Sequence, residues 1–426
     1  MTHLIRTFTH LILALPLAMA APVAAGSVPV ALPAPTVSPS PAISSYRPAI
    51  LRLGFSSSAA NGQGQAAPGE PSPGQADQGF VDLTLVPPDG PIIGKRVQLS
   101  VPQFVALLKD LYVRLARFEP LDVANPASAS RRLHALLIAP IEPELRRLGI
   151  TTLLVSVDAG LQALPLAALH DGTAYFGQTY AFSLTPSLGL MVKDLPRPEA
   201  AQRVLSMGAS EFQGLAPLPL VPQELANTSA AERSDRFLNK AFTPDVMLVK
   251  AGDPQYRRVH VATHAEFLPG GPGKSSIYSG TGPVSLTRFA ALRQRRQGVP
   301  LDLFSLSACR TALGNSDSEL GFSGLALQSG ARSALGTLWY VDDVAAAAFF
   351  IQFYRYLDRG LPKAEALQRT RSDFLEGRVR LQQDRLVGAE AEPLLADLSV
   401  AEQRRVSRGL QHPFYWAGIE LLGTPW

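Results

Sequence analysis

The sequence contains a single cysteine, Cys309, among its 426 residues. One cysteine cannot form a disulfide bond within the chain, so the fold depends on its hydrophobic core, and Cys309 is either free or links two chains. The histidines, carboxylates and this cysteine form no cluster with the spacing of metal ligands. We therefore expect neither a metal nor another cofactor.

A strong excess of one charge sign is also absent. The chain has 39 Lys and Arg against 35 Asp and Glu, which gives a net charge of +4. Because this excess is small and scattered, it does not indicate a nucleic-acid partner, and none is expected. The hydrophobic fraction of 46% and the length allow two or three domains with a large core.

Long apolar runs are missing beyond the N-terminus. There, Leu11–Ala20 is apolar, and both Ala18–Ala20 and Val23–Ala25 resemble signal peptidase sites. The pattern predicts a signal peptide over residues 1–25 and export to the periplasm, the cell envelope or the medium. If the segment stays uncleaved, it would instead tether the chain to a membrane.

Composition divides the remaining chain into three parts. Residues 26–78 are dominated by Pro, Ala, Ser and Gly, which predicts a disordered linker. Residues 79–130 form an N-terminal extension, with an alternating strand pattern over Phe80–Leu85 and then a helical pattern over Val101–Phe118. Residues 131–426 hold the main domain.

The main domain alternates strands with helices. The clearest strand patterns are Val259–Ala262, Leu303–Ser307 and Ala334–Trp339, and helical patterns follow at Val344–Tyr356 and Pro362–Leu375. Such alternation predicts an α/β fold with a parallel sheet and helices on both faces.

Residues 377–409 interrupt this alternation. They are rich in charge, and we expect a solvated helical insertion.

Two residues that can carry chemistry end neighbouring strand patterns. Cys309 closes the Leu303–Ser307 strand, and His264 follows the Val259–Ala262 strand. Ligand sites of open α/β sheets form at the carboxyl ends of the strands, so the thiol and the imidazole are expected to meet there. A thiol beside a histidine base is what nucleophilic catalysis requires. The alternative is that Cys309 is a buried structural cysteine without chemistry.

His260 lies within the strand rather than at its end. We expect it to pack in the core or to make a satisfied hydrogen bond.

The order of several short motifs is more specific than any one of them. The motifs are Asp158–Pro165, Thr185–Leu188, Leu218–Pro219 with Glu224–Leu225, Ala262–Phe267, Leu306–Gly314, Ser323–Ala326, Ala331–Ala334, Leu338–Asp343 and His412–Gly418. Together they cover about residues 130 to 426, and they resemble the CHAT-domain family of caspase-related cysteine peptidases.

This resemblance implies a caspase-like three-layer sandwich with a mostly parallel central sheet, and a His264–Cys309 dyad that cleaves a polypeptide substrate. It also implies that the backbone amides of Ala265 and Cys309 hold the oxyanion. The chain departs from the pattern at Ala265, where many relatives have glycine, but an alanine amide still donates.

Family members often carry tetratricopeptide repeats before this domain, and none is visible in the sequence. We therefore expect that a regulatory protein partner is either absent or supplied by another chain.

The resemblance also implies where specificity arises, because related peptidases often bind a basic residue of the substrate in an acidic pocket, and Asp342 and Asp343 are the candidates for that pocket. An acidic pair after the strand that follows the nucleophile would bind Arg or Lys of the substrate. The alternative is that one of them caps the helix beginning at Val344. For the whole chain, the alternative to a peptidase is a catalytically silent interaction module at the cell envelope.

Overall fold

A computed structural model describes residues 48–57, 78–158, 161, 164–185, 203–228, 233–266, 272–308, 326–327 and 329–426. These described residues belong to one compact unit. The predicted signal peptide, most of the predicted linker and Cys309 lie outside them. No helix within the described ranges is both long and apolar enough to cross a membrane.

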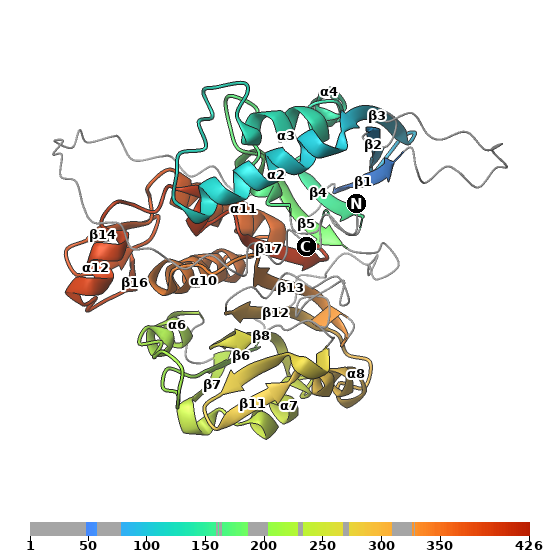
Figure 1. Ribbon diagram of the computed structural model, residues 1–426. Coiled ribbons are helices and arrows are strands. Elements are labelled where there is room, and N and C mark those ends of the chain that lie inside the picture. Colours follow the sequence, from blue (N-terminus) through green and yellow to red (C-terminus); the bar gives the residue numbers. More distant parts are fainter. Residues whose placement is uncertain are drawn as a thin grey trace. The chain divides into compact units, whose positions relative to one another are not determined.

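Within the described residues, eleven strands form the main sheet (Figure 1). Their order across the sheet is β3-β2-β1-β4-β5-β17-β13-β12-β8-β6-β7. The bounds are β1 Ala49–Ser57, β2 Gln78–Val86, β3 Ile93–Ser100, β4 Thr152–Val157, β5 Ala181–Thr185, β6 Arg203–Gly208, β7 Ser234–Leu238, β8 Tyr256–Ala262, β12 Leu301–Ser307, β13 Ala331–Thr337 and β17 Ile419–Gly423.

Most neighbouring strands in this sheet are parallel. The antiparallel pairs are β3 with β2, β2 with β1, and β17 with β13. All other neighbours run in the same direction. The expected mostly parallel sheet is therefore confirmed, and β8, β12 and β13 contain or overlap the three strand patterns of the main domain.

Helices cover both faces of the sheet around β8 (Figure 1). The helix bounds are α2 Val101–Ala116, α3 Ala129–Leu137, α4 Glu142–Arg147, α5 Phe176–Thr179, α6 Val221–Asn227, α7 Pro244–Ala251, α8 Ala290–Arg295, α10 Asp343–Asp358, α11 Lys363–Leu375 and α12 Val400–Val406. Helices α6 and α10 lie on one face, and α7 and α8 lie on the other, which gives the expected three layers.

Strand β8 shows why both faces are covered. Val259 and Val261 pack into the cluster that contains residues of α7 and α8. His260 contacts α10, and Ala262 packs against Val221 of α6, because successive side chains of a strand point to opposite faces. The carboxyl-terminal half of β8 is therefore buried on both sides, and it is apolar apart from His260.

Strand β1 corrects the predicted linker. Residues Ala49–Ser57 lie in the middle of that segment, yet they pair with β2 on one side and β4 on the other. Leu51 and Leu53 are fully buried. The Pro- and Gly-rich flanks hid this short apolar stretch, because composition averages over residues whereas a strand needs only a few alternating ones.

The insertion at residues 377–409 is also different from the expectation. It forms a small sheet of β14 (Arg380–Gln382), β15 (Arg385–Val387) and β16 (Pro393–Leu395), followed by α12. Seven of its apolar side chains are buried: Val379, Leu386, Val387, Leu394, Leu395, Leu398 and Val406. The segment is therefore a packed element, because these few apolar residues outweigh the surrounding charge.

Candidate functional site

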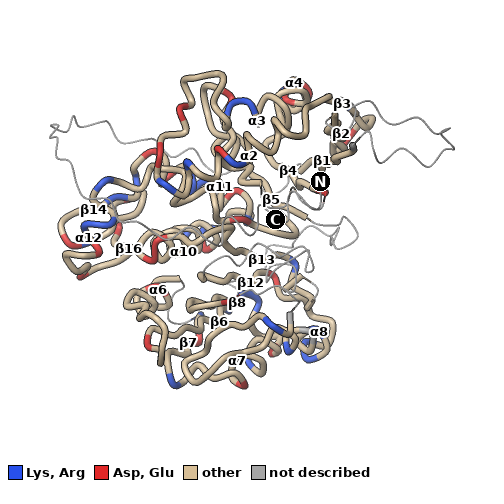
Figure 2. Tube along the Cα trace, viewed as in Figure 1, with Lys and Arg blue, Asp and Glu red and all other residues tan. Residues whose placement is uncertain are grey.

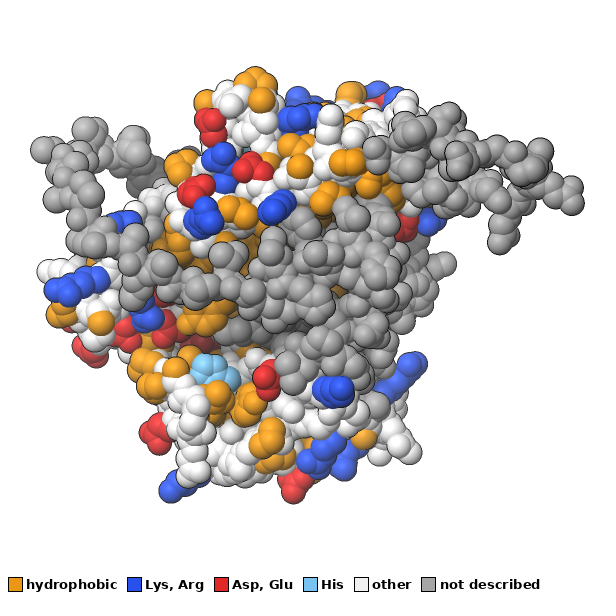
Figure 3. Space-filling view, viewed as in Figure 1, with side chains coloured by type: hydrophobic (Ala, Val, Ile, Leu, Met, Phe, Trp, Pro, Cys, Tyr) orange, Lys and Arg blue, Asp and Glu red, His pale blue; other side chains and the backbone are white. Residues whose placement is uncertain are grey.

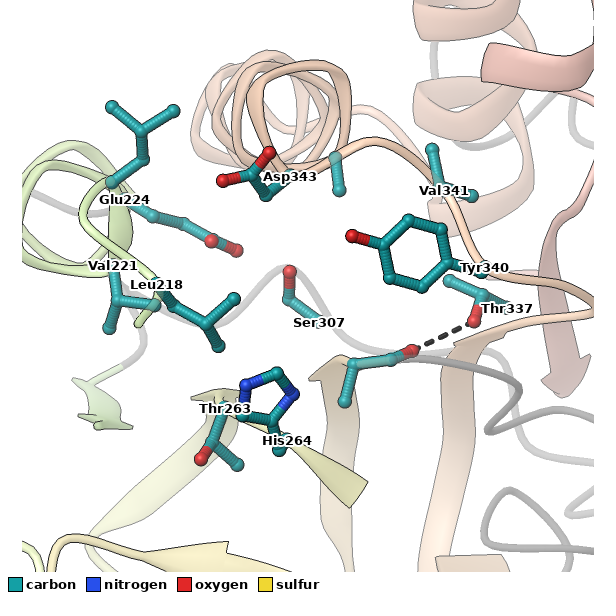
Figure 4. A pocket seen from close by; sticks show the side chains of 13 residues that line it. Leu218, Val221, Glu224, Thr263, His264, Ser307, Thr337, Tyr340, Val341 and Asp343 are labelled. Carbon is teal, nitrogen blue, oxygen red and sulfur yellow. Dashed lines mark hydrogen bonds between the residues drawn. The ribbon is translucent and has the colours of Figure 1, made fainter. Parts of the chain in front are cut away.

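One pocket opens where three parallel strands end at their carboxyl side (Figure 4). Its wall includes residues at or just after the ends of β8, β12 and β13. Helix α6 with its preceding loop and the first turn of α10 close the other side. This is the position at which ligand sites form in open α/β sheets.

The pocket combines polar and apolar side chains around a cavity of about 50 Å³. The polar ones are Glu224, Thr263, His264, Ser307, Thr337, Tyr340 and Asp343. The apolar ones are Leu218, Leu220, Val221, Ala308, Val341 and Ala346. Neither Lys nor Arg is among these described lining residues, so the formal charge around the cavity is negative.

His264 lies in this pocket, directly after β8. Its Nε2 atom is 2.8 Å from the carbonyl oxygen of Ala216. Because a carbonyl oxygen only accepts hydrogen bonds, Nε2 carries the proton of the neutral ring and Nδ1 is the basic nitrogen. The ring also packs on Phe212, with 4.7 Å between the ring centroids. These two contacts hold the imidazole in one orientation.

The backbone of His264 is held by a small antiparallel sheet. This sheet consists of β9 (Ala265–Glu266), β10 (Ser276–Ser279) and β11 (Gly282–Ser285). The Tyr278 amide donates to the His264 carbonyl oxygen at 2.9 Å, and Ala265 lies opposite Ile277. Hydrogen-bonded and non-hydrogen-bonded pairs alternate along an antiparallel ladder, so the Ala265 amide points away from β10.

The end of β12 is held on the opposite wall. Ser307 and Ala308 line the pocket, and the Thr337 hydroxyl donates to the Ala308 carbonyl oxygen at 2.8 Å (Figure 4). Cys309 follows directly in the chain but lies outside the described residues. The pairing of β12 with β8 brings the Ala308 end of the strand next to the His264 end of β8.

The two predicted specificity residues have different surroundings. Asp342 is the N-cap of α10, and it accepts hydrogen bonds from the amides of Val344 and Ala345 at 3.0 and 3.3 Å. The predicted capping role is thus confirmed for Asp342. Burial raises the pKa of Asp342, although the nearby Arg405 guanidinium opposes the shift.

Asp343 lines the pocket, but it also has a cation beside it. The Arg405 side chain of α12 lies 2.7 Å from Asp343 and 3.5 Å from Asp342. The insertion therefore supplies a positive charge to both predicted residues.

Glu224 is a lining residue to which sequence reasoning assigned no role. It lies on α6 with its carboxylate toward the cavity (Figure 4), although it is only 3% exposed. Its Oε1 is 3.0 Å from Nε2 of His260, which confirms that His260 makes a satisfied buried hydrogen bond. The available signal was helical spacing: Val221, Glu224 and Leu225 share one face, so a carboxylate lies on an apolar stripe.

The surface around this region is apolar rather than strongly charged. Figure 3 shows hydrophobic side chains gathered around a histidine on this face. Leu215 and Tyr340 are 38% and 47% exposed. Acidic and basic positions are scattered over the described chain and do not form one charged field (Figure 2). Exposed apolar side chains beside a polar pocket are typical of an interaction surface or a ligand-binding groove.

Comparison with solved structures finds matches at low identity and low TM-score. The chain is similar to the Saccharomyces cerevisiae separase–securin complex, with a TM-score of 0.40, 14% identity, and coverage of 76% of this chain and 19% of that chain. It is also similar to the Arg-specific cysteine proteinase gingipain R, with a TM-score of 0.39, 9% identity, and coverage of 76% and 75%.

A complex of the pro- and mature domains of Porphyromonas gingivalis RgpB gives a TM-score of 0.39, 8% identity, and coverage of 75% and 76%. The chain spans about a fifth of the length of the separase chain that it matches. No curated protein matches it.

The CHAT domain family matches residues 127–424, which is the greater part of the sequence. This match confirms the resemblance expected from the motif series, and it agrees with the caspase-like arrangement of a mostly parallel sheet between helices. The chain belongs to the CHAT domain family.

Proposed function

We propose that this chain is a caspase-like cysteine endopeptidase in which His264 and Cys309 form the catalytic dyad. One observation carries the proposal. His264 and Ala308, the residue immediately before Cys309, line the same pocket at the carboxyl ends of neighbouring parallel strands. When a base and a nucleophile follow the ends of neighbouring parallel strands, the few residues after each strand are enough to bring the two side chains into contact.

In the proposed reaction, Nδ1 of His264 takes the proton from the Cys309 thiol. The thiolate attacks the carbonyl carbon of the scissile peptide bond, and the amides of Ala265 and Cys309 hold the oxyanion. His264 then returns the proton to the leaving amine. Water attacks the resulting thioester with His264 as general base, which releases the acid and restores the thiol.

The position of the Ala265 amide supports its part in this proposal. The amide points away from β10, so the ladder does not use it, and it follows directly after His264. The donor is the backbone amide of the residue that follows the base, so it can reach the reacting carbonyl whether that residue is glycine or alanine. The replacement of glycine by Ala265 is therefore compatible with activity.

We further propose that the chain acts on a polypeptide after export, with a regulatory protein partner either absent or supplied by another chain. The apolar N-terminal stretch with its A-x-A sites supports export. Fractionation of cells that express the full chain with a C-terminal tag tests this. Recovery of the full-length, unprocessed protein in the cytoplasm would contradict export.

Labelling of Cys309 by an electrophilic peptide tests the proposed dyad. The parent, Cys309→Ala and His264→Ala are compared, with thermal unfolding as the check that each variant is folded. We expect rapid labelling of the parent, none of Cys309→Ala, and labelling slowed by about a hundredfold or more in His264→Ala, because general base catalysis typically contributes 10²–10⁴. Equal labelling of the parent and His264→Ala would overturn the dyad and favour a catalytically silent interaction module.

A further inference from the structure

Helix α6 lies between the insertion at residues 377–409 and the loop that contacts His264. One face of α6 lines the pocket with Val221 and Glu224 (Figure 4). Another part of the helix packs against β16 of the insertion. Before its first residue, the chain forms the loop whose Ala216 carbonyl oxygen lies 2.8 Å from Nε2 of His264. The helix therefore connects the insertion with a contact of the proposed catalytic base.

The insertion holds α6 through backbone groups of β16 and of the residue that follows it. The Gln223 side-chain amide donates to the Ala396 carbonyl oxygen and accepts from the Ala396 amide, both at 2.8 Å. One turn along the helix, the Asn227 side chain donates to the Leu394 carbonyl oxygen at 3.1 Å. Because α6 has only seven residues, it has little stability of its own, and tertiary contacts such as these determine its position.

The same strand is also anchored on α10. The Arg355 side chain donates to the Pro393 carbonyl oxygen at 2.7 Å, and it forms an ion pair of 2.7 Å with Glu392. Leu394 and Leu395 of β16 are buried. Helix α10 is 16 residues long, and it packs on β12 of the main sheet as well as on α6 and β16. Strand β16 therefore holds α6 in a fixed place relative to α10, the helix on the opposite wall of the pocket.

The link from α6 to His264 is short. The Val221 amide, in the first turn of α6, donates to the Leu218 carbonyl oxygen at 3.2 Å, and the Leu218 amide donates to the Ser210 carbonyl oxygen at 3.0 Å. These bonds close the loop on which Ala216 lies, so its carbonyl oxygen follows the position of the first turn of α6. Because that oxygen accepts from Nε2 of His264, the loop also determines which nitrogen of the neutral ring carries the proton.

Two glycines form the ends of the insertion. Gly377 has a φ angle of 69° and Gly409 one of 86°, in the left-handed region that favours glycine. A Cβ atom added to Gly377 would lie 2.6 Å from Nε2 of Gln411, and one added to Gly409 would overlap the same side-chain amide. The two connections of the insertion therefore lie side by side, and a side chain added at either one displaces the base of the insertion.

We propose that the insertion positions the proposed catalytic base, and that Gln223 is the positioning residue through which it acts. The insertion holds α6, α6 holds the loop, and the loop holds the His264 ring with Nδ1 as its basic nitrogen. Asn227 has a smaller part, because it makes one hydrogen bond where Gln223 makes two. The effect on catalysis rests on the proposed peptidase function, but the state of the ring can be measured without turnover.

The first experiment observes the His264 ring by nuclear magnetic resonance in the Cys309→Ala protein. With ¹⁵N-labelled histidine, two-bond proton–nitrogen correlations distinguish a ring protonated at Nε2 from one protonated at Nδ1, and His264→Asn assigns the signal. Gln223→Ala removes both bonds to Ala396. Gln368→Ala is the matched control, since Gln368 is also half-buried and its side-chain amide donates to the Gln178 carbonyl oxygen at 2.7 Å, outside the pocket.

We expect a ring protonated at Nε2 in the parent and in Gln368→Ala at about pH 8, where an ordinary histidine is neutral. In Gln223→Ala, we expect a mixture of the two neutral forms, because the Ala216 carbonyl oxygen no longer selects one of them. Thermal unfolding checks that each variant is folded. An unchanged signal in Gln223→Ala overturns the proposal. An equal change in Gln368→Ala also overturns it, because the ring would then respond to any loss of an inter-element bond.

A second pair of variants displaces the insertion without changing α6. Gly409→Ala places a side chain against Gln411. Gly90→Ala is its control, because Gly90 also has a left-handed φ of 99°, but a Cβ there meets no atom of the described residues within 4 Å. We expect the His264 signal to change in Gly409→Ala as it does in Gln223→Ala, and to stay as in the parent in Gly90→Ala. The same signal in both glycine variants would contradict the link.

Labelling of Cys309 by an electrophilic peptide separates this inference from the proposed function. Gln223→Ala should lower the maximal labelling rate by about tenfold, because a displacement of about 1 Å in a reacting group costs up to about a hundredfold. The peptide concentration that gives half the maximal rate should stay within about twofold. A change in that concentration alone would mean that the insertion shapes peptide binding and not the base, which overturns the proposal.

The two measurements together show which proposal fails. If His264→Ala is labelled as fast as the parent while the ring signal still changes in Gln223→Ala, the peptidase proposal fails and the link from the insertion to His264 stands. If labelling requires His264 but Gln223→Ala keeps the labelling rate and the ring signal of the parent, the link fails and the peptidase proposal stands.

Discussion

The Thr337 hydroxyl donates a hydrogen bond of 2.8 Å to the Ala308 carbonyl oxygen, and this bond ties the end of β12 to the end of β13. The carbonyl belongs to the peptide bond that leads into Cys309. We expect Thr337→Val to keep the volume and remove the bond, which lowers the free energy of unfolding by about 1 kcal/mol. We also expect slower labelling of Cys309 by an electrophilic peptide. Urea unfolding and labelling rates measure the two effects.

Thr152 provides a matched control for this change. Its hydroxyl is buried in β4 and has no hydrogen-bond partner among the described residues. Thr152→Val should therefore leave the free energy of unfolding unchanged or raise it, because no bond is lost and an unsatisfied polar group is removed. It should not affect labelling. A loss of stability in Thr152→Val equal to that in Thr337→Val would contradict this account.

Strand β1 should contribute strongly to stability although it lies within a Pro- and Gly-rich stretch. Leu51 is fully buried between the neighbouring strands, so we expect Leu51→Ala to lower the free energy of unfolding by about 2–5 kcal/mol. Arg52→Ala, one position along, removes an exposed side chain whose ion pair with Asp158 spans 3.6 Å, and it should change stability by less than about 1 kcal/mol. Similar small effects of both variants in urea unfolding would show that β1 is not part of the folded sheet.

Glu420 predicts a specific pH dependence of stability. The residue is fully buried on β17, and burial raises its pKa to about 7, partly offset by the Arg371 guanidinium 3.2 Å away. Between the unfolded pKa of about 4.3 and this value, the folded state binds more protons than the unfolded state. The free energy of unfolding should therefore fall as pH rises through this window, by up to about 1.4 kcal/mol per pH unit.

Comparison of the parent with Glu420→Gln isolates this contribution. Urea unfolding between about pH 5 and pH 8 should show that the difference in stability between the two proteins shifts in favour of the variant as pH rises. Parallel pH profiles would mean that Glu420 is ionised throughout and that the Arg371 pair determines its state.

Arg405 should influence the pocket from the insertion. Its guanidinium offsets the charges of Asp342 and Asp343, so Arg405→Gln leaves the Asp343 carboxylate without its counter-charge. We expect a rise of several-fold in kcat/KM for peptides with Arg or Lys before the cut and a loss of about 1 kcal/mol in the free energy of unfolding, since the arginine is partly exposed. A fall in kcat/KM for basic peptides would instead show that Arg405 is needed to orient Asp343.

Local patterns were sufficient for the strands that position the site. Strands β8 and β12 are buried on both faces near their carboxyl ends, and each contains a short, mainly apolar run there that can be recognised from a few residues. His264 was found for the same reason, because the end of an apolar run marks the end of the strand.

Contacts between distant residues could not be found in this way. The Glu224–His260 hydrogen bond joins residues 36 positions apart, and the Arg405–Asp343 pair depends on how the insertion docks against α10. Nothing in the local pattern of either segment indicates its partner, because both contacts are set by packing. The location of Cys309 relative to His264 stays a prediction, since Cys309 is outside the described residues.

Strand β17 lies between β5 and β13 in the main sheet, and it follows all the other strands of that sheet in chain order. On one side of it, β4 and β5 run parallel to β17. On the other side, β13, β12 and β8 run in the opposite direction. During synthesis, two separate partial sheets therefore emerge from the ribosome before the strand that joins them. A newly made chain therefore cannot join the two halves of its main sheet until residues 419–423 have left the ribosome.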